Sequence, residues 1–202
     1  MQVHWDHVGE PRKFPTSTFV VGHGALSLLA GTSPKFRGSP SFFEPDLLPP
    51  GRSIELSNPR AHAEKQDSAV AQGTLSFGGP RLAHGILPQI LDLFNDGSLL
   101  IFNAPGHLPG HINILSRTAD GRRVYLGGDS CHDRRLLTGV KEIGEWTDAK
   151  GHVCCIHADR EEAGETIRRT RMLEQEGVEV IIAHDDEWED NPANKTRFFG
   201  AG

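Results

Sequence analysis

The chain has 202 residues, of which 24% are charged and 37% hydrophobic, a composition typical of soluble globular proteins. Its formal net charge of −6, without a run of Lys or Arg, argues against a nucleic-acid-binding surface. No apolar run is long enough to cross a bilayer and no signal peptide is recognisable. We therefore expect a cytoplasmic protein of one domain, residues 1–202, with neither a membrane nor a nucleic-acid partner.

The first residues of the chain hold a cluster of possible metal ligands, His4, Asp6 and His7. A strand would place His4 and Asp6 on the same side, because side chains alternate along a strand, and a following turn could bring His7 back to them. Imidazole nitrogens and carboxylate oxygens suit Zn²⁺. The alternative is a solvated, frayed terminus that happens to contain two histidines.

Short apolar or alternating runs predict strands at residues 18–21 and 53–56, with one or two helical turns at residues 25–30 between them. Residues 32–50 are rich in Pro, Ser and Gly and indicate an irregular loop. Residues 58–88 are polar and glycine-rich without a clear period. We expect this long stretch to cover a functional site and to influence substrate choice.

Four strands are predicted in the middle of the chain, at residues 90–94, 98–103, 112–117 and 123–126, because β-favouring runs alternate there with turn signals. Asn95-Asp96-Gly97 separates the first pair and Ala119-Asp120-Gly121 the last pair. Three cysteines, Cys131, Cys154 and Cys155, fit neither a disulfide framework nor a C-x-x-C site, so we expect reduced thiols that are mostly buried.

A helix and a strand are predicted near the C-terminus. Asp159 with Glu162 fits a capping arrangement at the helix start, and Gly177 fits the position just after its end. The expected buried face comprises Ala163, Ile167, Thr170 and Leu173. Residues 178–183 then form a mostly apolar strand, and His184 stands at its carboxyl end, where α/β sheets usually bind ligands.

Metal-compatible side chains follow three of the predicted strands. The segment Pro105-Gly106-His107-Leu108-Pro109-Gly110-His111 follows one strand, Gly128-Asp129 the next, and His184 the last. With the N-terminal cluster, these motifs resemble the metallo-β-lactamase superfamily: its H-x-H-x-D-H motif, its P-G-H-x-P-G-H turn, its bridging aspartate and its last histidine, in that order. The resemblance implies an α/β fold, the αββα sandwich of that superfamily.

The resemblance also implies two adjacent zinc ions and assigns their ligands. His4 and His111 would bind the first ion, Asp6, His7 and His184 the second, and Asp129 both. Asp6 and Asp129 would be the catalytic carboxylates. A hydroxide held between the two ions would attack a carbonyl carbon, because two cations lower the pKa of a shared water.

The chain departs from the family pattern at its N-terminus. Gln2 stands where the motif has its first histidine, and an amide is a poor replacement for imidazole on zinc. The N-terminal part of the sandwich is also missing from the sequence. We therefore predict an incomplete domain whose first metal site has fewer than its usual ligands.

Three other side chains near the motifs have open roles. His107 is expected to support the ligands rather than to bind metal. His132 could contact substrate or could be an exposed loop residue. Trp5 could line a substrate pocket or could be a buried anchor.

The predicted function is a zinc-dependent hydrolase that opens a lactone, lactam or ester, with a small acyl compound as its partner. A thioesterase similar to glyoxalase II is an enzymatic alternative. A catalytically impaired fragment or pseudoenzyme is the alternative from another class, and Gln2 motivates it.

Overall fold

The computed structural model describes residues 2–33, 43–59, 87 and 89–197. Most of the stretch 58–88, which was predicted to cover the site, lies outside the described residues, as does part of the predicted loop 32–50.

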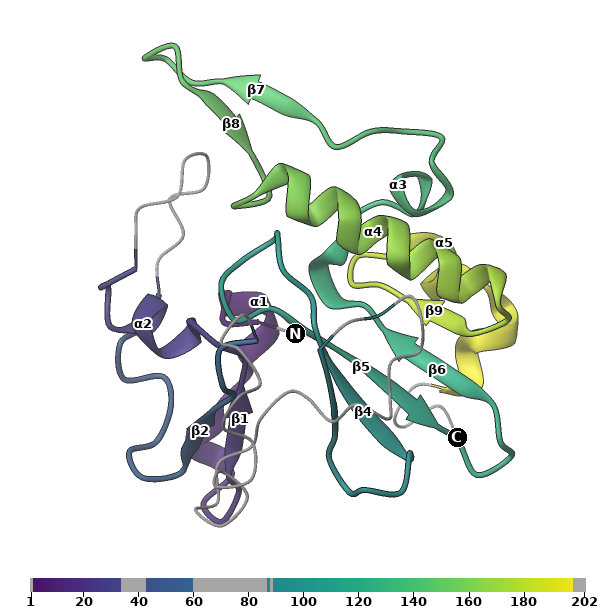
Figure 1. Ribbon diagram of the computed structural model, residues 1–202, viewed down its shortest axis with the longest axis horizontal. Coiled ribbons are helices and arrows are strands. Elements are labelled where there is room, and N and C mark those ends of the chain that lie inside the picture. The colour runs from purple at the N-terminus through teal and green to yellow at the C-terminus, as the bar shows by residue number, and fades with distance from the viewer. Residues whose placement is uncertain (1, 34–42, 60–86, 88, 198–202) are drawn as a thin grey trace.

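A five-stranded sheet forms the centre of the molecule (Figure 1). Its strands, in spatial order, are β3 (Ile90–Asp92), β4 (Leu99–Asn103), β5 (Ile112–Arg117), β6 (Arg123–Leu126) and β9 (Glu179–Ile181). The pairs from β3 to β6 are antiparallel, whereas β9 pairs with β6 in parallel. The predicted strands in these regions are confirmed, and β5 and β6 have the predicted bounds.

The two faces of this sheet contribute to different hydrophobic clusters, because neighbouring residues of a strand point to opposite sides. Leu100 and Phe102 belong to the largest cluster, together with residues of the helix α4 (Arg160–Gln175). Ile101, between them, belongs to a cluster with Leu56, which follows β2 (Ser53–Glu55). The sheet is therefore covered by α4 on one face and by a second, two-stranded sheet of β1 (Phe19–Val21) and β2 on the other.

The helix α4 has the predicted ends and the predicted buried face. The Asp159 carboxylate accepts a hydrogen bond from the backbone N–H of Glu162, which satisfies one of the free donors of the first turn. Gly177 has a φ of 83°, the left-handed conformation expected just past a helix end. All four residues of the predicted apolar face are buried.

The N-terminal segment is helical, so the predicted strand there is wrong. Trp5–Val8 forms the short helix α1, and His7 donates its backbone N–H to the carbonyl of His4. The helical turn brings His7 back beside His4, which the strand model required a separate turn to do. The 3₁₀ helix η1 (Pro11–Lys13) and the helix α2 (Ala25–Leu29) follow.

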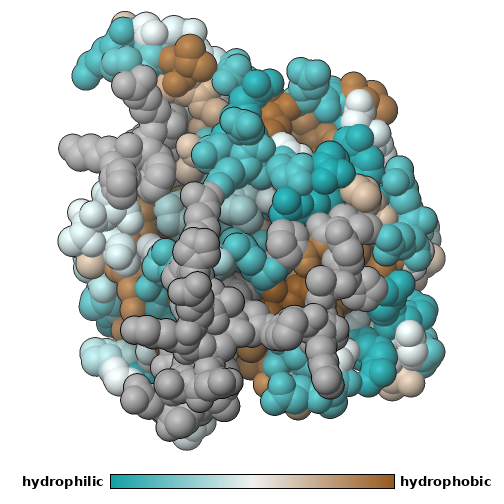
Figure 2. Space-filling view, in the orientation of Figure 1, coloured by the Kyte–Doolittle hydropathy of each residue, from teal (hydrophilic) through white to brown (hydrophobic). Residues whose placement is uncertain are grey.

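Several short elements were not predicted. They are the 3₁₀ helix η4 (Gly128–Ser130), the helix α3 (Arg134–Thr138), the strands β7 (Glu145–Thr147) and β8 (Val153–Cys155), the helix α5 (Asp186–Asp190) and the 3₁₀ helix η5 (Pro192–Arg197). β7 and β8 form a hairpin that projects from the body (Figure 1). Figure 2 shows a mostly hydrophilic face with separate hydrophobic patches, one at the top where this hairpin lies. Trp146 and Val153 of the hairpin are 47% and 58% exposed.

Two expectations from composition can be compared with the structure. Among the described residues, no helix is both long and apolar enough to span a membrane. The three cysteines are free thiols; Cys131 and Cys154 are buried, as predicted, whereas Cys155 is only half-buried. Burial raises the pKa of the Cys131 thiol to about 12, which keeps it protonated.

Candidate metal centre

Side chains from four separate segments meet near the ends of β4, β6 and β9. Among the described residues, metal-compatible side chains form three groups, and within each group the ligand atoms all lie within 4.8 Å of one another. The first group is His4, His107 and Asp129; the second group is Asp6, His7 and His184; the third group is Asp129, His132 and His184. Five of the six predicted ligands are among these seven residues, and the sixth, His111, is not.

Asp129 lies at the centre of these groups and is 2% exposed. Its Oδ2 lies 3.0 Å from His7 Nε2 and 3.2 Å from His107 Nε2. The other oxygen of Asp129, Oδ1, is buried and has no hydrogen-bond partner among the described residues. It lies 3.6 Å from His184 Nε2. Burial alone would raise the pKa of Asp129, but the surrounding imidazoles, His107 first, hold it well below its usual range. Asp129 is therefore an anion with a free acceptor oxygen facing several imidazoles.

The first group contains imidazoles that stay neutral. Burial, reinforced by the neighbouring His107, lowers the pKa of His4 to about 4. Burial also lowers the pKa of His107, although Asp129 opposes this shift. His107 Nε2 lies only 3.3 Å from His4 Nδ1. Two neutral ring nitrogens this close to a carboxylate are a donor set that fits a divalent cation, because metal ligands must be deprotonated.

The second group is more open to solvent. Asp6 Oδ2 lies 3.6 Å from His7 Nε2 and 3.5 Å from His184 Nε2, and the His184 side chain is 47% exposed. A hydrogen bond to Asp129 is the largest cause of the raised pKa of His7. A cation bound here would have to displace the proton that Asp129 stabilises on His7.

His111, which the motif assigns to the first ion, is not among the residues of these groups. Its ring is 1% exposed, and its Nε2 accepts a hydrogen bond from the backbone N–H of Asp129 at 3.1 Å. Its Nδ1 donates to the carbonyl of Ala104 at 3.0 Å. Both ring nitrogens are thus bonded to backbone, so His111 holds Asp129 in place while His107, four residues earlier, faces the site.

Gln2 also enters the site, although the sequence marks it only as a missing histidine. Its amide Nε2 donates to Asp129 Oδ2 at 2.9 Å and to His4 Nδ1 at 2.6 Å, and its Oε1 accepts from the backbone N–H of His4 at 2.5 Å. The Gln2 amide therefore bonds to two of the three side chains of the first group.

The turn that carries His107 is held by close backbone contacts. Gly106 has a φ of 117°, and a Cβ there would lie 2.1 Å from the backbone nitrogen of Ala163 in α4. The backbone N–H groups of Ala158 and Asp159 donate to the carbonyls of His107 and Gly106 at 2.9 and 2.8 Å. Only glycine can adopt this conformation at this distance from the helix.

A buried polar network supports the η4 turn that carries Asp129. The amide of Asn113, oriented by its surroundings, accepts hydrogen bonds from Ser130 Oγ at 2.7 Å and Tyr125 OH at 2.9 Å, and donates to the carbonyls of Gly127 and Ile112 at 2.9 and 3.1 Å. All four hydrogen bonds of the amide are satisfied, as its complete burial requires.

Two further side chains, His132 and Trp5, had two alternative roles predicted from sequence. His132 is not an exposed loop residue: its Nε2 lies 3.6 Å from Asp129, and its ring stacks on His184 at 5.4 Å. Trp5 is 83% exposed, so the buried-anchor alternative is wrong. A further histidine, His157, is buried with its Nδ1 3.3 Å from His107 Nδ1, and burial lowers its pKa to about 3.

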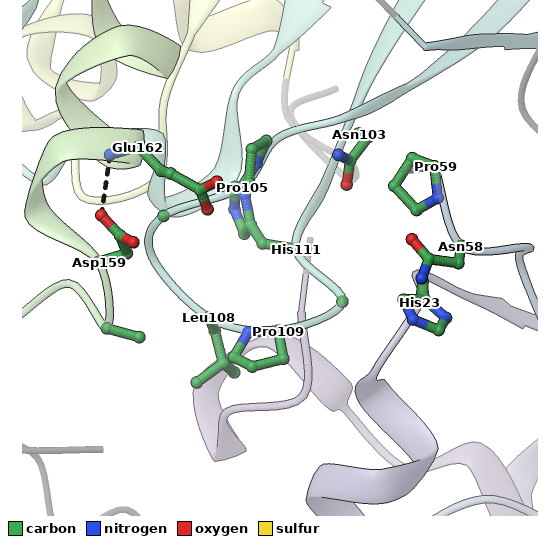
Figure 3. Close-up of a pocket in the computed structure, with 13 residues that line it drawn as sticks. His23, Asn58, Pro59, Asn103, Pro105, Leu108, Pro109, His111, Asp159 and Glu162 are labelled. Carbon is green, nitrogen blue, oxygen red and sulfur yellow. Dashed lines mark hydrogen bonds between the residues drawn. The ribbon is translucent and has the colours of Figure 1, made fainter. Parts of the chain in front are cut away.

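Two cavities adjoin the site. One, of about 180 Å³, has mostly apolar walls and is bounded by Gln2 and His7. The other, of about 410 Å³, lies against the His107 turn and is shown in Figure 3, where Pro105, Pro109 and His111 form part of its lining. None of the residues of the three metal-compatible groups lines this second cavity.

No family model matches the chain. Among curated relatives, the cytochrome P450 monooxygenase mpaDE of Penicillium roqueforti is 35% identical over 144 residues, which are 69% of this chain and 15% of the relative. The metallo-hydrolase mfmC of Annulohypoxylon moriforme is 31% identical over 66% of this chain and 30% of its own length. The γ-lactamase FDB1 of Fusarium pseudograminearum is 29% identical over 64% of this chain and 27% of its own length. The chain thus spans less than a third of each of these relatives.

Two solved structures resemble most of the chain. An AiiA variant of B. thuringiensis with N-decanoyl-L-homoserine at its active site gives a TM-score of 0.56 at 15% identity, over 93% of this chain and 55% of the other. A quorum-quenching N-acyl homoserine lactone hydrolase gives a TM-score of 0.57 at 16% identity, over 94% of this chain and 57% of the other. The chain therefore has part of the metallo-β-lactamase fold. Together with the curated relatives, this confirms the resemblance to the metallo-β-lactamase superfamily.

Proposed function

We propose that the chain is the metal-binding part of a metal-dependent hydrolase that opens a lactone, or a related lactam or ester. The observation that carries this proposal is the buried Asp129 carboxylate, which both the first and the third group share and which has a free oxygen. The names of the metallo-hydrolase and γ-lactamase relatives and of the lactonase structures support the same class of reaction. The monooxygenase activity of mpaDE is not extended to this chain, because the match covers 15% of that protein.

The proposed ligands follow the observed groups rather than the motif alone. His4, His107 and Asp129 would hold the first ion, and Asp6, His7 and His184 the second, with Asp129 between them. His107 thus replaces His111 in the expected set. The mixture of imidazole and carboxylate donors fits Zn²⁺. Such ions, when bound, would supply a nucleophilic water near neutral pH and polarise a carbonyl.

The chain's own residues would bind and orient the substrate. His132 lies beside both Asp129 and His184, so its ring would border a substrate bound at these ligands. The apolar cavity beside His7 has room for a small apolar substituent, and its walls include Val3, Val8 and Leu47. The exposed Trp5, next to Asp6 in α1, offers a further apolar surface. These features support a substrate with an acyl group attached to a polar ring or ester.

Two alternatives make different predictions. A thioesterase would use the same ions and would differ only in its substrate. An impaired protein is favoured by Gln2, because its amide already donates to His4 and Asp129 and must move before these atoms can bind a metal.

The test is hydrolysis by the zinc-loaded chain of an N-acyl homoserine lactone, a γ-lactam, an aryl ester and a thioester, with and without a chelator. We expect chelator-sensitive opening of the lactone or lactam, and at least about a tenfold loss in Asp129→Asn. Faster turnover of the thioester would favour the thioesterase. A zinc-bound chain that hydrolyses none of the four would establish the impaired protein instead.

A further inference from the structure

We infer that Arg134 is a positioning residue for His184, acting through an ion pair with Asp185. This inference rests on the proposed function, since it concerns the hold on one proposed metal ligand. Arg134 belongs to α3, and neither Arg134 nor Asp185 is a member of the metal-compatible groups.

His184 needs external support more than the other proposed ligands do. Its side chain is 47% exposed, whereas His107 is 3% exposed and enclosed by the fold. Its backbone has a φ of 59°, a left-handed conformation that is uncommon for residues other than glycine. The ring stacks on His132 and meets the ring of His7 edge-on, with ring centroids 5.4 and 5.9 Å apart. Because 47% of the side chain is exposed, the position of His184 also depends on the backbone on either side of it.

A backbone hydrogen bond holds Ala183, the residue that precedes His184. The N–H of Ala183 donates to the carbonyl of Gly128 at 2.9 Å, which joins the end of β9 to the turn that carries Asp129. This hydrogen bond keeps the residue before His184 close to the turn that carries Asp129. It does not involve His184 itself or the residue that follows it.

The ion pair with Arg134 holds Asp185, the residue that follows His184. Arg134 Nη2 donates to Asp185 Oδ2 at 2.6 Å and Arg134 Nε donates to the same oxygen at 3.0 Å. The Asp185 side chain is 3% exposed, and its Oδ1 accepts the backbone N–H of Trp188 at the start of α5. Two donors of one planar guanidinium fix both the position and the direction of the carboxylate.

Arg134 is itself anchored to the sheet and to α4. Its Nη2 also donates to the carbonyl of Val180 in β9 at 2.9 Å, and its Nη1 donates to Glu174 at 2.8 Å. The guanidinium therefore connects a strand, the long helix and the residue after His184. A lysine, with a single ammonium group, could not make all these contacts.

The competing explanation is that Arg134 only joins α3 to the rest of the fold. Arg171 provides the matched control, because it links the same two helices: its Nε and Nη2 donate to the carbonyls of Leu137 and Leu136 in α3. None of these contacts involves the residues around His184. Loss of Arg171 should therefore weaken the contact between the helices without changing the metal site.

The experiment is a double-mutant cycle on zinc affinity, measured by competition with a chromophoric chelator in the full chain. Arg134→Met, His184→Ala and the double variant form the cycle, with Arg171→Met as control. We expect Arg134→Met to lower the zinc affinity of the site that contains His184 at least about tenfold, as is typical when a group that orients a ligand is lost. The same substitution should have almost no further effect once His184 is absent. Arg134→Lys should recover only part of the affinity, and Asp185→Asn should resemble Arg134→Met.

A second measurement separates failure of this inference from failure of the proposed function. Amide hydrogen exchange of residues 184–186 in zinc-free protein should become faster in Arg134→Met, but not in Arg171→Met. If the unmodified chain binds no zinc, the proposed function fails, and this exchange still reports whether Arg134 holds the His184 segment. Unchanged exchange, or an equal loss of zinc affinity with and without His184, would overturn the inference. If Arg134→Met does not fold, Arg134→Lys and Asp185→Asn carry the same comparisons.

Discussion

At the scale of single residues, His107 and His111 divide two tasks that either histidine of their turn could perform. His107 faces His4 and Asp129, whereas both ring nitrogens of His111 are bonded to backbone groups. We expect His107→Ala to lower zinc affinity at least about tenfold. His111→Ala should instead lower the free energy of unfolding of the zinc-free protein by about 2 kcal/mol or more, because it leaves two buried backbone groups without partners. Zinc titration and urea denaturation measure the two effects. If His111→Ala instead lowers zinc affinity and His107→Ala lowers stability, His111 rather than His107 is the metal ligand.

Gln2 leads to a prediction about metal content. Because its amide donates to His4 and Asp129, it competes with a cation for both. We expect the first site to be incompletely filled after dialysis, and Gln2→His to raise the bound zinc towards about two ions per chain, the number in two-metal hydrolytic sites. Gln175→His is the control, since it adds an imidazole at the exposed end of α4. Equal zinc contents in both variants, measured by elemental analysis, would mean that position 2 does not limit binding.

The buried imidazoles predict how stability depends on pH. Burial lowers the pKa of His4 to about 4 and that of His157 to about 3, whereas both would titrate near the ordinary value of about 6.5 in the unfolded chain. Between about pH 6.5 and pH 4 the unfolded chain therefore binds protons that these two folded residues do not, and the free energy of unfolding falls as the pH is lowered. His7, whose pKa is raised, opposes this trend, but burial lowers the pKa values of His107 and His111 as well, so four residues act against one.

Urea denaturation of zinc-free protein at pH 7 and pH 5 measures this effect. We expect lower stability at pH 5, and a smaller difference between the two pH values in His157→Leu, which removes one of the buried imidazoles. Equal or greater stability at pH 5 would show that His7 dominates.

At the scale of elements, the site depends on how closely the His107 turn approaches α4. A Cβ at Gly106 would lie 2.1 Å from the Ala163 backbone, and neither backbone segment can move without breaking the hydrogen bonds from Ala158 and Asp159. We expect Gly106→Ala to lower the free energy of unfolding by about 3 kcal/mol or more, a size that only a few mechanisms such as overpacking produce.

Gly121→Ala is the matched control for this prediction. Gly121 also has a positive φ, 83°, but nothing lies within 4 Å of a Cβ placed there. Its replacement should cost only the conformational strain, about 1 kcal/mol. Chemical denaturation of both variants separates the two contributions. If they are equally stable, the contact with α4 is not what restricts position 106.

At the scale of the whole molecule, local pattern predicted the elements that have their own sequence signals. β5 and β6 have the predicted bounds because apolar alternation meets a clear Ala-Asp-Gly turn, and α4 has its predicted cap at Asp159. The hairpin β7–β8 was missed because β7 is exposed along its length and shows no buried face to detect.

The composition of the site was less predictable than its location. The motifs placed Asp6, His7, Asp129 and His184 together because each follows or begins an element at one edge of the sheet. The helix α1, the contact of Gln2 with Asp129, and the position of His107 rather than His111 beside His4 depend on residues more than 100 positions apart or on the geometry of one turn. A pattern of neighbouring residues does not contain that information.

The most direct test of the central claim is anomalous diffraction at the zinc absorption edge from zinc-soaked crystals of the full chain. Two anomalous peaks are expected on either side of the Asp129 carboxylate. One should lie at a coordination distance of about 2.0–2.1 Å from His4 and His107, and the other at a similar distance from His7 and His184. Zinc peaks elsewhere on the protein, with none at ligand distance from Asp129, would contradict the proposed metal centre.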